Sequence, residues 1–335
     1  MNRKQDVYLQ NPVGRQINAD LLQEFERGLN PASPTDSRVP ARILGYGEIS
    51  TVFEIQIEEL RGLAFKRLPI FETLEEMEKY LAAYKEYNRL LEEDIGIRPP
   101  ANGYVAFVSN TGRPILYIVQ KMLPSSWLAH KALHTLPAEA TPLLARRILR
   151  ELRKVWDFNR QQNRLQVAID GQLSNWAIEN FDPAGSTLAE QVPLLYLDTS
   201  TPLFRVQGDE QLNPELFLRN APSFLAWLIR LLFLKDVMNR YYDFHLVAVD
   251  LLANVYKEQK AALIPGLVRA TNEFFAGEAA ELGIKPVEEK EVQSYYQEDA
   301  FIWSFYLSAR RLDRFIRSRL LRREYPYILP GKIKR

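Results

Sequence analysis

An aspartate and an asparagine near the middle of the chain have the chemistry and spacing of a metal-assisted reaction centre. Asp170 and Asn175 lie five residues apart, directly after the apolar stretch 167–169. Such a loop can present a carboxylate to an attacking hydroxyl group and an amide oxygen to a magnesium ion. An Asp-Gly turn followed by an Asn cap would use the same residues, so this loop alone leaves both interpretations open.

A second carboxylate, Asp198, ends another short apolar stretch, 194–197, and precedes three residues with hydroxyl groups. A carboxylate at the end of a strand can fix a magnesium ion, which bridges phosphates during phosphoryl transfer. The alternative is an aspartate that caps a turn through the hydroxyl groups that follow it.

A glycine-containing run, G-x-G-x-x-S-x-V from Gly45 to Val52, lies between two predicted strands. Gly45 and Gly47 would let the backbone approach a triphosphate closely, and amides of the turn could donate to its oxygens. The glycines lead into a strand rather than opening a helix, which argues against a dinucleotide-binding fingerprint. An ordinary glycine-containing hairpin is the alternative.

Lys66 lies in the next apolar strand, in the tripeptide Ala64-Phe65-Lys66. An ammonium group beside a phosphate site can hold phosphate oxygens, whereas the alternative is a lysine on a solvated strand face. The long helix that follows carries Glu86, and we expect this carboxylate to turn inward and pair with Lys66. Other acidic residues of that helix compete for this role: Glu75, Glu76, Glu78 and Glu92.

The elements that would position these residues can be read from apolar periodicity. Three segments of residues 41–68 are rich in β-forming apolar residues, as are 104–108 and 115–121, which predicts five antiparallel strands. Between them, apolar residues recur at helical spacing over 72–94 and predict one long helix. After Pro124 the pattern is mainly helical.

Three regions follow from these elements. Residues 1–40 are expected to hold a helix with Asp20 as its N-cap and a connector rich in Pro and Ser. Residues 41–123 would form a sheet lobe and residues 124–335 a helical lobe. We therefore predict an α+β fold of two lobes, with a five-stranded antiparallel sheet and one long helix in the first and mainly helices in the second.

These motifs occur in the order glycine loop, lysine, helix glutamate, Asp-x4-Asn and strand-end aspartate. In this order the chain resembles the protein-kinase-like superfamily over about residues 41–198. The resemblance implies a two-lobed protein-kinase-like fold that binds ATP and Mg²⁺. Ser50 replaces the third loop glycine, and the usual neighbours of Asp170 and Asp198 are also changed. The chain therefore resembles small-molecule kinases, such as aminoglycoside and choline phosphotransferases, more closely than it resembles eukaryotic protein kinases.

The resemblance also implies a role for each matched residue. Asp170 would be the catalytic base, and Lys66, held by Glu86, would bind phosphate. Asn175 and Asp198 would be the magnesium ligands. The nucleotide would contact the glycine loop, the strand of the lysine and the hinge after the fifth strand, through Gly45, Gly47, Ser50, Val52, Ala64, Lys66, Gln120 and Met122.

These roles predict an ATP-dependent phosphotransferase that acts on a hydroxyl group of an unidentified small molecule. Two alternatives keep the nucleotide site. The altered neighbours of Asp170 and Asp198 would suit a pseudokinase that binds nucleotide without turnover. The same residues could also hold ATP in the orientation needed for nucleotidyl transfer.

Composition narrows the function classes. Lys plus Arg (43) and Asp plus Glu (42) nearly cancel, which argues against a broad surface for nucleic-acid phosphates. The absence of cysteine excludes disulfides, and three histidines make a histidine metal site a poor expectation. The N-terminus lacks an apolar signal segment, and the most apolar run, 224–234, is too short for a bilayer. We therefore expect a cytoplasmic protein without a transmembrane segment.

The end of the chain is basic. Residues 310–335 contain ten Lys and Arg against one Asp and one Glu. A terminal helix packed on the second lobe is one interpretation, and a docking surface for a membrane, nucleic acid or acidic partner is the other. An apolar stripe at helical spacing accompanies this charge: Phe301, Phe305, Leu312, Phe315 and Ile316.

Overall fold

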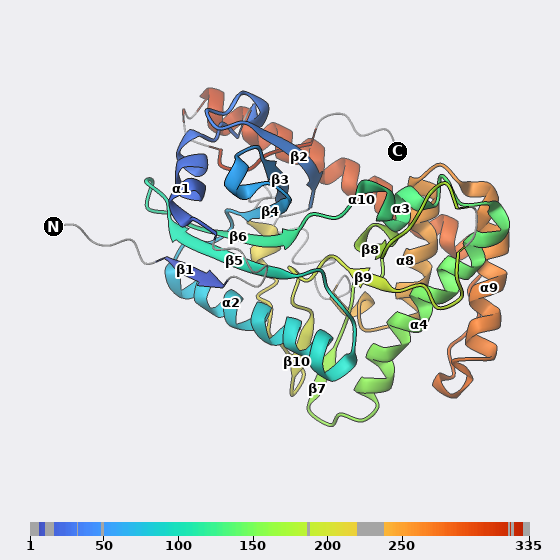
Figure 1. Cartoon of the computed structure of the whole chain (residues 1–335). Coiled ribbons are helices and arrows are strands. Elements are labelled where there is room, and N and C mark those ends of the chain that lie inside the picture. The colour runs from blue at the N-terminus through green and yellow to red at the C-terminus, as the bar shows by residue number, and fades with distance from the viewer. Residues whose placement is uncertain are drawn as a thin grey trace.

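The computed structural model combines a large antiparallel sheet with a mainly helical part, and is of mixed α+β class (Figure 1). The main sheet has the strand order β1-β5-β6-β4-β3-β2. Its strands are β1 Tyr8–Gln10, β2 Ala41–Tyr46, β3 Thr51–Ile55, β4 Leu63–Leu68, β5 Asn102–Val108 and β6 Pro114–Lys121. The structure describes residues 7–10, 17–31, 33–47, 50–185, 188–219, 238–320, 322 and 325–330.

All five predicted strands are present, but the expected count of five is wrong. The sixth strand, β1, pairs with β5 at the edge of the sheet, with Tyr8 opposite Ala106 and Gln10 opposite Tyr104. Three residues are too few to show a period of two, so alternation could not reveal this strand. A stretch of the N-terminal region therefore belongs to the sheet.

Helices cover both faces of this sheet. The helix predicted over 72–94 is present as α2 (Leu74–Arg89), continued by the π-helical turn η3 (Leu90–Ile95), and packs on one face. On the other face lies α1 (Ala19–Gly28), which buries Leu22 and Phe25. Its N-cap is Asn18 rather than the expected Asp20, because the Asn18 side chain accepts the Asp20 N–H at 2.9 Å.

Helices dominate after β6. They are α3 Ala129–Ala132, α4 Thr141–Asn159, α5 Glu215–Leu218, α8 Phe244–Lys257, α9 Ile264–Ala276 and α10 Glu289–Phe315, the last continued by the π-helical turn η9 Ile316–Leu320. This part of the chain also contains two small antiparallel sheets. One consists of β7 Leu165–Val167, β10 Phe204–Val206 and β11 Asp209–Glu210, and the other consists of β8 Trp176–Ile178 and β9 Leu194–Tyr196. None of the helices within the described ranges is long and apolar enough to cross a membrane. The apolar run 224–234 lies outside the described residues.

The last described segment, 325–330, returns to the main sheet. Tyr325, Tyr327 and Leu329 join the core on the α2 side, and Arg67 Nη1 donates to the Pro326 carbonyl at 2.9 Å. A segment that periodicity assigned to the helical part therefore packs on the sheet.

Candidate active site

An ion pair joins the main sheet to the loop after β9. Lys66 Nζ on β4 lies 2.7 Å from Asp198 Oδ1, and the two side chains are 22% and 20% exposed. Ser200 Oγ donates to the same carboxylate oxygen at 2.7 Å, and Thr201 Oγ1 lies 3.4 Å from Oδ2. The structure therefore brings together two residues that the sequence motifs had singled out.

The environment of Asp198 favours its charged form. Burial alone would raise the pKa of the carboxyl group, but the charge and hydrogen bond of Lys66 oppose it, together with hydrogen bonds from Ser200. The net result is a pKa of Asp198 below its ordinary value. At neutral pH this site therefore holds an ionised carboxylate.

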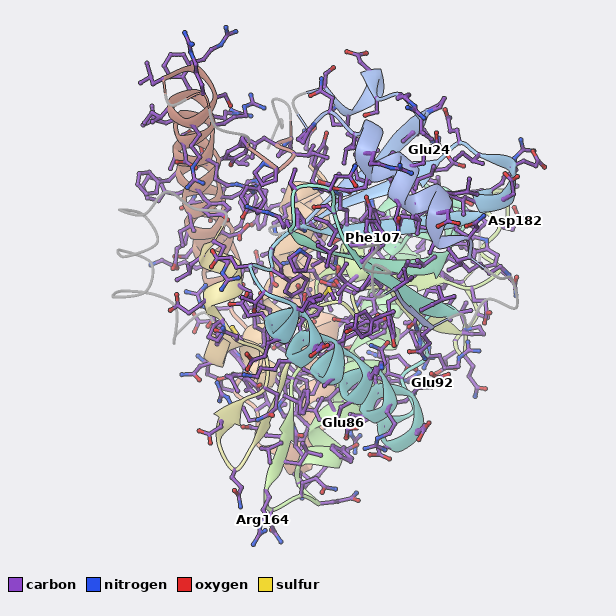
Figure 2. All side chains as sticks on the ribbon, turned by 90° about the vertical axis from the view of Figure 1, so that its left-hand side faces the viewer. Glu24, Glu86, Glu92, Phe107, Arg164 and Asp182 are labelled. Carbon is purple, nitrogen blue, oxygen red and sulfur yellow. The ribbon has the colours of Figure 1, made fainter. Side chains whose placement is uncertain are left out.

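Glu86 does not make the expected pair with Lys66. Its carboxylate binds Arg89, three residues later on the same helix, at 2.8 Å, and its side chain is 45% exposed. It lies on the outer side of α2 (Figure 2). The carboxylate is satisfied locally because residues i and i+3 are neighbours on a helix surface, and Lys66 takes Asp198 instead.

The inner face of α2 carries tyrosines rather than a glutamate. Tyr80, Tyr84 and Tyr87 recur at spacings of four and three residues and are all buried. Their hydroxyl groups donate, in that order, to the Ser200 carbonyl, to Asn102 Oδ1 at 2.7 Å and to the Ala168 carbonyl at 2.9 Å. The helix thereby holds the segments around both Asp198 and Asp170. In the sequence, the helical spacing of these three tyrosines indicates a buried helix face, but it does not indicate which hydrogen bonds their hydroxyl groups make.

The Asp170–Asn175 loop lies beside the Asp198 segment. The Leu197 N–H donates to the Asn175 carbonyl at 2.8 Å. Within the loop, Asp170 Oδ1 accepts the Gln172 N–H at 3.0 Å, and Asn175 Nδ2 lies 3.4 Å from the Asp170 carbonyl. The three candidate polar residues therefore belong to two hydrogen-bonded adjacent segments.

The residue after Asp170 must be a glycine, because there is no room for a side chain at this position. A Cβ atom at Gly171 would lie 2.5 Å from Val247 Cγ1 on α8 and 3.3 Å from Leu152 Cδ1 on α4. The loop therefore packs tightly against α8 and α4, which fixes the position of Asp170 relative to these two helices.

A buried aspartate beneath this loop was missed by sequence reasoning. Asp250 on α8 is 6% exposed and accepts from Asn254 Nδ2 at 3.2 Å. Burial raises the pKa of Asp250 to about 6, although the positive charge of Lys257 and a hydrogen bond from Gln172 act in the other direction. The only sequence signal was an acidic residue inside the apolar run 246–253.

The glycine run passes close to the lysine. A Cβ atom at Gly47 would lie 2.6 Å from Ser50 Oγ and 3.9 Å from Lys66 Cε, whereas Gly45, on β2, has open space. Ser50 Oγ is buried and has no hydrogen-bond partner within the described part of the chain. Val52 is the cross-strand neighbour of Lys66.

The expected hinge residues are engaged in the fold. Gln120 stands opposite Ala64 across β6 and β4, and its Nε2 donates to the Leu197 carbonyl at 2.9 Å, next to Asp198. The Met122 N–H donates to the Gly62 carbonyl at 2.9 Å. Gln120 therefore positions the Asp198 segment, and the Met122 N–H already has an acceptor.

Comparisons with known proteins place the chain in a family. Residues 29–314 match the model of a family of unknown function, DUF6206. The chain belongs to the DUF6206 family. A search of curated proteins finds no match. Among solved structures, a chain of "WaaP in complex with acyl carrier protein" is similar, with a TM-score of 0.35 and 12% identity over 88% of this chain and 98% of that chain.

The DUF6206 match contains the whole candidate site, from Gly45 to Asp198, and the tyrosines of α2. It leaves out β1 and the segment 325–330, which both pack on the sheet.

The donor set of this DUF6206 site could accept a magnesium ion. Within the described ranges, no three His, Cys, Asp or Glu side chains gather as a metal site, but Mg²⁺ bound partly by phosphate and water needs only one or two protein oxygens. Asp198 Oδ1 accepts from both Lys66 and Ser200 at 2.7 Å, whereas Oδ2 has the longer 3.4 Å contact with Thr201, so Oδ2 would be the better ligand. Asn175 Nδ2 faces the Asp170 carbonyl, so the amide oxygen of Asn175, Oδ1, points away from that carbonyl.

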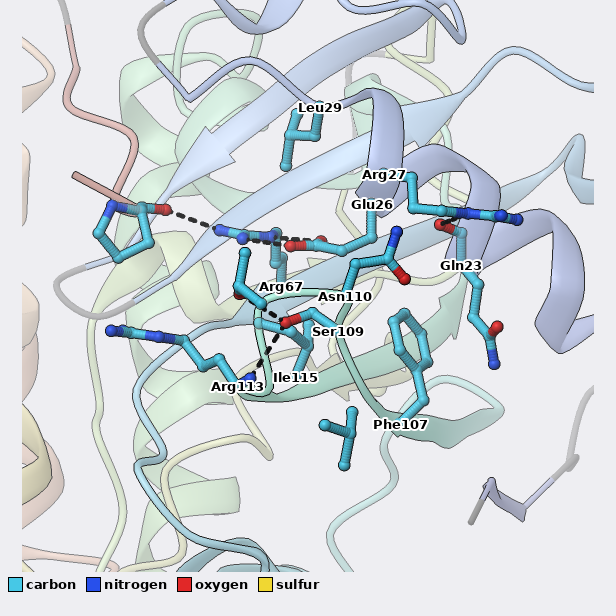
Figure 3. Close-up of a pocket in the computed structure, with 13 residues that line it drawn as sticks. Gln23, Glu26, Arg27, Leu29, Arg67, Phe107, Ser109, Asn110, Arg113 and Ile115 are labelled. Carbon is cyan, nitrogen blue, oxygen red and sulfur yellow. Dashed lines mark hydrogen bonds and ion pairs between the residues drawn. The ribbon is translucent and has the colours of Figure 1, made fainter. Parts of the chain in front are cut away.

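A pocket of about 370 Å³ opens away from this site, on the face of the sheet that carries Arg67 (Figure 3). Arg67 is 4% exposed and binds Glu26 through Nε at 2.8 Å and Nη2 at 2.5 Å. Side chains alternate along β4, so Lys66 and Arg67 point to opposite faces. The pocket therefore has no direct access to Lys66.

Proposed function

We propose that this chain is an ATP-dependent phosphotransferase of two-lobed, protein-kinase-like architecture, which transfers the γ-phosphoryl group to a hydroxyl group of a small molecule. The observation that carries the proposal is the 2.7 Å ion pair between Lys66 and Asp198, residues 132 positions apart. A strand lysine and a loop carboxylate beside an Asp-x4-Asn loop are the groups that phosphoryl transfer requires for positioning and charge stabilisation.

In the proposed reaction, the acceptor oxygen attacks the γ-phosphorus, the bond from that phosphorus to the β–γ bridging oxygen breaks, and ADP leaves. Asp170 accepts the proton of the attacking hydroxyl group. Lys66 holds phosphate oxygens, and Ser50 offers a buried hydroxyl donor under the glycine loop. Bound Mg²⁺ would supply positive charge that offsets the charge of the phosphates.

Nucleotide binding would require an exchange of partners. Lys66 and Asp198 are paired with each other in this structure. In the proposed complex, Asp198 and Asn175 hold the metal, and Lys66 turns to the phosphates. The ion pair thus keeps both groups in place and compensates their charges before the nucleotide arrives.

The experiment combines a melting curve with a mass measurement. If Mg-ATP binds the folded chain, 100 times its dissociation constant adds about 2.7 kcal/mol of stability, visible as a raised melting temperature. A metabolite screen with ATP should then give one product heavier by a phosphate group. The absence of any shift with Mg-ATP would contradict the proposal.

A second candidate is a pseudokinase that binds nucleotide without turnover. It is favoured by the pairing of Lys66 with Asp198 while Glu86 binds Arg89, because a lysine held by a helix glutamate is part of the active arrangement that the resemblance implies. A thermal shift without any product across the screen would support it. A product heavier by AMP would instead indicate nucleotidyl transfer.

A further inference from the structure

Exposed apolar side chains gather on one helix of this chain. Six of the eleven large apolar side chains that are exposed within the described ranges lie on α10 and η9, including all three exposed phenylalanines. Contiguous exposed apolar patches mark interaction surfaces. We call these six side chains the α10 apolar face: Phe301 (72% exposed), Ile302 (38%), Phe305 (46%), Leu312 (51%), Phe315 (56%) and Leu320 (67%).

The α10 apolar face is wide. At 3.6 residues per turn, its members on α10 span about 140° of the helix circumference, from Phe315 to Ile302. Leu320 follows Phe315 by five residues, about one turn of the π-helical η9, and so extends the same face. Ala309 is buried at the edge of the face, and the other residues that α10 buries lie opposite: Val292, Leu307 and Arg310. In Figure 2 the helix stands along one edge of the molecule.

The acidic residues just before this face already have partners within the chain. Three carboxylates toward the start of α10 bind side chains of other elements at 2.8, 3.0 and 3.1 Å: Glu291 with His245, Glu298 with Arg240, and Asp299 with Lys257. These acidic residues therefore contribute little negative charge to the surface around the α10 apolar face.

The other end of the helix has an excess of positive charge. Residues 310–322 contain six arginines and one acidic residue, Asp313, which pairs with Arg317 at 2.9 Å. Arg314, Arg319 and Arg322 have no acidic partner within the described part of the chain. Arg319 and Arg322 are also exposed. The second half of the α10 apolar face thus lies among arginines that can bind anionic groups from outside the chain.

The width of the face and the positive charge together favour a lipid surface over other partners. A nucleic acid would bind the arginines but leave the phenylalanines in water. A single partner helix would cover a narrow seam, whereas this face spans about 140°. The interfacial region of a bilayer accepts aromatic and aliphatic side chains and offers anionic phosphate groups beside them.

We infer that α10 and η9 bind an anionic lipid surface. The helix lies in the plane of that surface, with the α10 apolar face inserted at the level of the headgroups and Arg314, Arg319 and Arg322 bound to lipid phosphates. Removal of apolar side chains from water and attraction to anionic lipid both contribute to this kind of binding. Neither contribution involves the nucleotide site.

Sedimentation of the full-length chain with vesicles gives the first test. The dissociation constant should be at least about tenfold lower for vesicles of equal phosphatidylcholine and phosphatidylglycerol than for vesicles of phosphatidylcholine alone, because the arginines act only on the anionic lipid. Binding to the mixed vesicles should weaken as salt rises from about 0.1 M to about 0.5 M, since salt screens exposed charges.

Loss of two phenylalanines tests the apolar contribution. Phe301→Ser combined with Phe315→Ser should raise the dissociation constant for the mixed vesicles at least about tenfold, because two aromatic side chains no longer leave water. The matched control is Val206→Ser on β10, which is 40% exposed and should bind the vesicles as the parent does.

Charge reversal tests the arginines. Arg319→Glu combined with Arg322→Glu should abolish the preference for phosphatidylglycerol. The control changes the net charge by the same amount at two exposed cations on α3 and α9, through Lys131→Glu and Arg269→Glu, and should keep that preference.

A fluorescent label tests the contact in a chain that keeps all its phenylalanines and arginines. The chain has no cysteine of its own, so a single cysteine can be labelled selectively. A polarity-sensitive dye on Leu312→Cys should shift its emission to shorter wavelength when the mixed vesicles are added, because residue 312 enters the apolar region. The same dye on Val206→Cys should show no shift.

Four outcomes would overturn the inference. The parent chain could fail to bind the mixed vesicles at low salt, or bind them and the phosphatidylcholine vesicles equally. The dye on Leu312→Cys could show no shift with the mixed vesicles. The chain could also form a dimer that binds no vesicles and dissociates with Phe301→Ser and Phe315→Ser, which would assign the α10 apolar face to a second copy of the chain.

Discussion

Tyr87 on α2 donates its hydroxyl hydrogen to the carbonyl oxygen of Ala168 at 2.9 Å, two residues before Asp170. Tyr80, on the same helix face, donates to the carbonyl oxygen of Ser200, two residues after Asp198. The helix therefore positions the backbone on which both candidate acidic residues stand, although it provides no carboxylate to Lys66.

Tyr87→Phe should loosen the Asp170 loop. It leaves the Ala168 carbonyl without this donor in a buried place, which costs about 1–3 kcal/mol of unfolding free energy. Hydrogen exchange read by mass spectrometry should quicken over residues 168–175. Tyr84→Phe is the matched control, since it also removes one hydroxyl bond, but to Asn102 on the sheet. Equal exchange of the loop in both variants would contradict this role of Tyr87.

Removing the charge of Asp198 and removing that of Glu86 should have different effects on the thermal shift with ATP. Asp198→Asn removes the proposed metal ligand, so the thermal shift with ATP should lose its dependence on magnesium. Glu86→Gln should keep the full shift and its magnesium dependence, because Glu86 binds Arg89 on the outer side of α2. If Glu86→Gln abolished the shift, Glu86 would have to turn inward in the nucleotide complex.

Local periodicity was sufficient for much of the fold. Five strands and α2 carry apolar residues over five or more positions. Burial alternates along β3 and β4, whereas β5 and β6 are buried on both faces. The meeting of Lys66 with Asp198 also agrees with the order of the motifs, which had placed both at one site.

What periodicity missed depends on contacts between distant segments. The edge strand β1 exists only because β5 offers a free edge, and residues 325–330 have no period of their own. The direction of Glu86 was decided by its neighbours: once Tyr84 and Tyr87 fill the inner face of α2, position 86 points outward, where Arg89 binds it.

Asp250 should make stability depend on pH. Its folded pKa of about 6 lies above its ordinary value of 3.8, so the folded state holds this proton more tightly. The protonated carboxyl group is accommodated at pH 4. As pH rises through about 6, charging the buried group costs on the order of 3 kcal/mol, and stability falls. Arg240, Lys257 and Asp299 are the charged groups that act on it.

Asp250→Asn should remove that cost. Urea unfolding at pH 8 should then show a variant more stable than the parent, by up to about 3 kcal/mol, with little difference at pH 4. Asp243→Asn is the matched control on the same helix, because asparagine also serves as an N-cap and should change stability by less than about 0.5 kcal/mol at either pH. A variant less stable than the parent at pH 8 would show that the Asp250 charge is compensated.

Gly171→Ala should destabilise the chain, because its new methyl group would lie 2.5 Å from Val247 Cγ1. Such overpacking costs about 1–3 kcal/mol of unfolding free energy. Val247→Ala, which loses stability alone, should recover part of that cost when combined with Gly171→Ala, so the double-mutant cycle should show coupling. Gly266→Ala on α9 is the control: it meets open space and should raise stability by up to about 1 kcal/mol. If the stability losses of Gly171→Ala and Val247→Ala were simply additive, the loop would have to move away from α8 to accommodate the new methyl group.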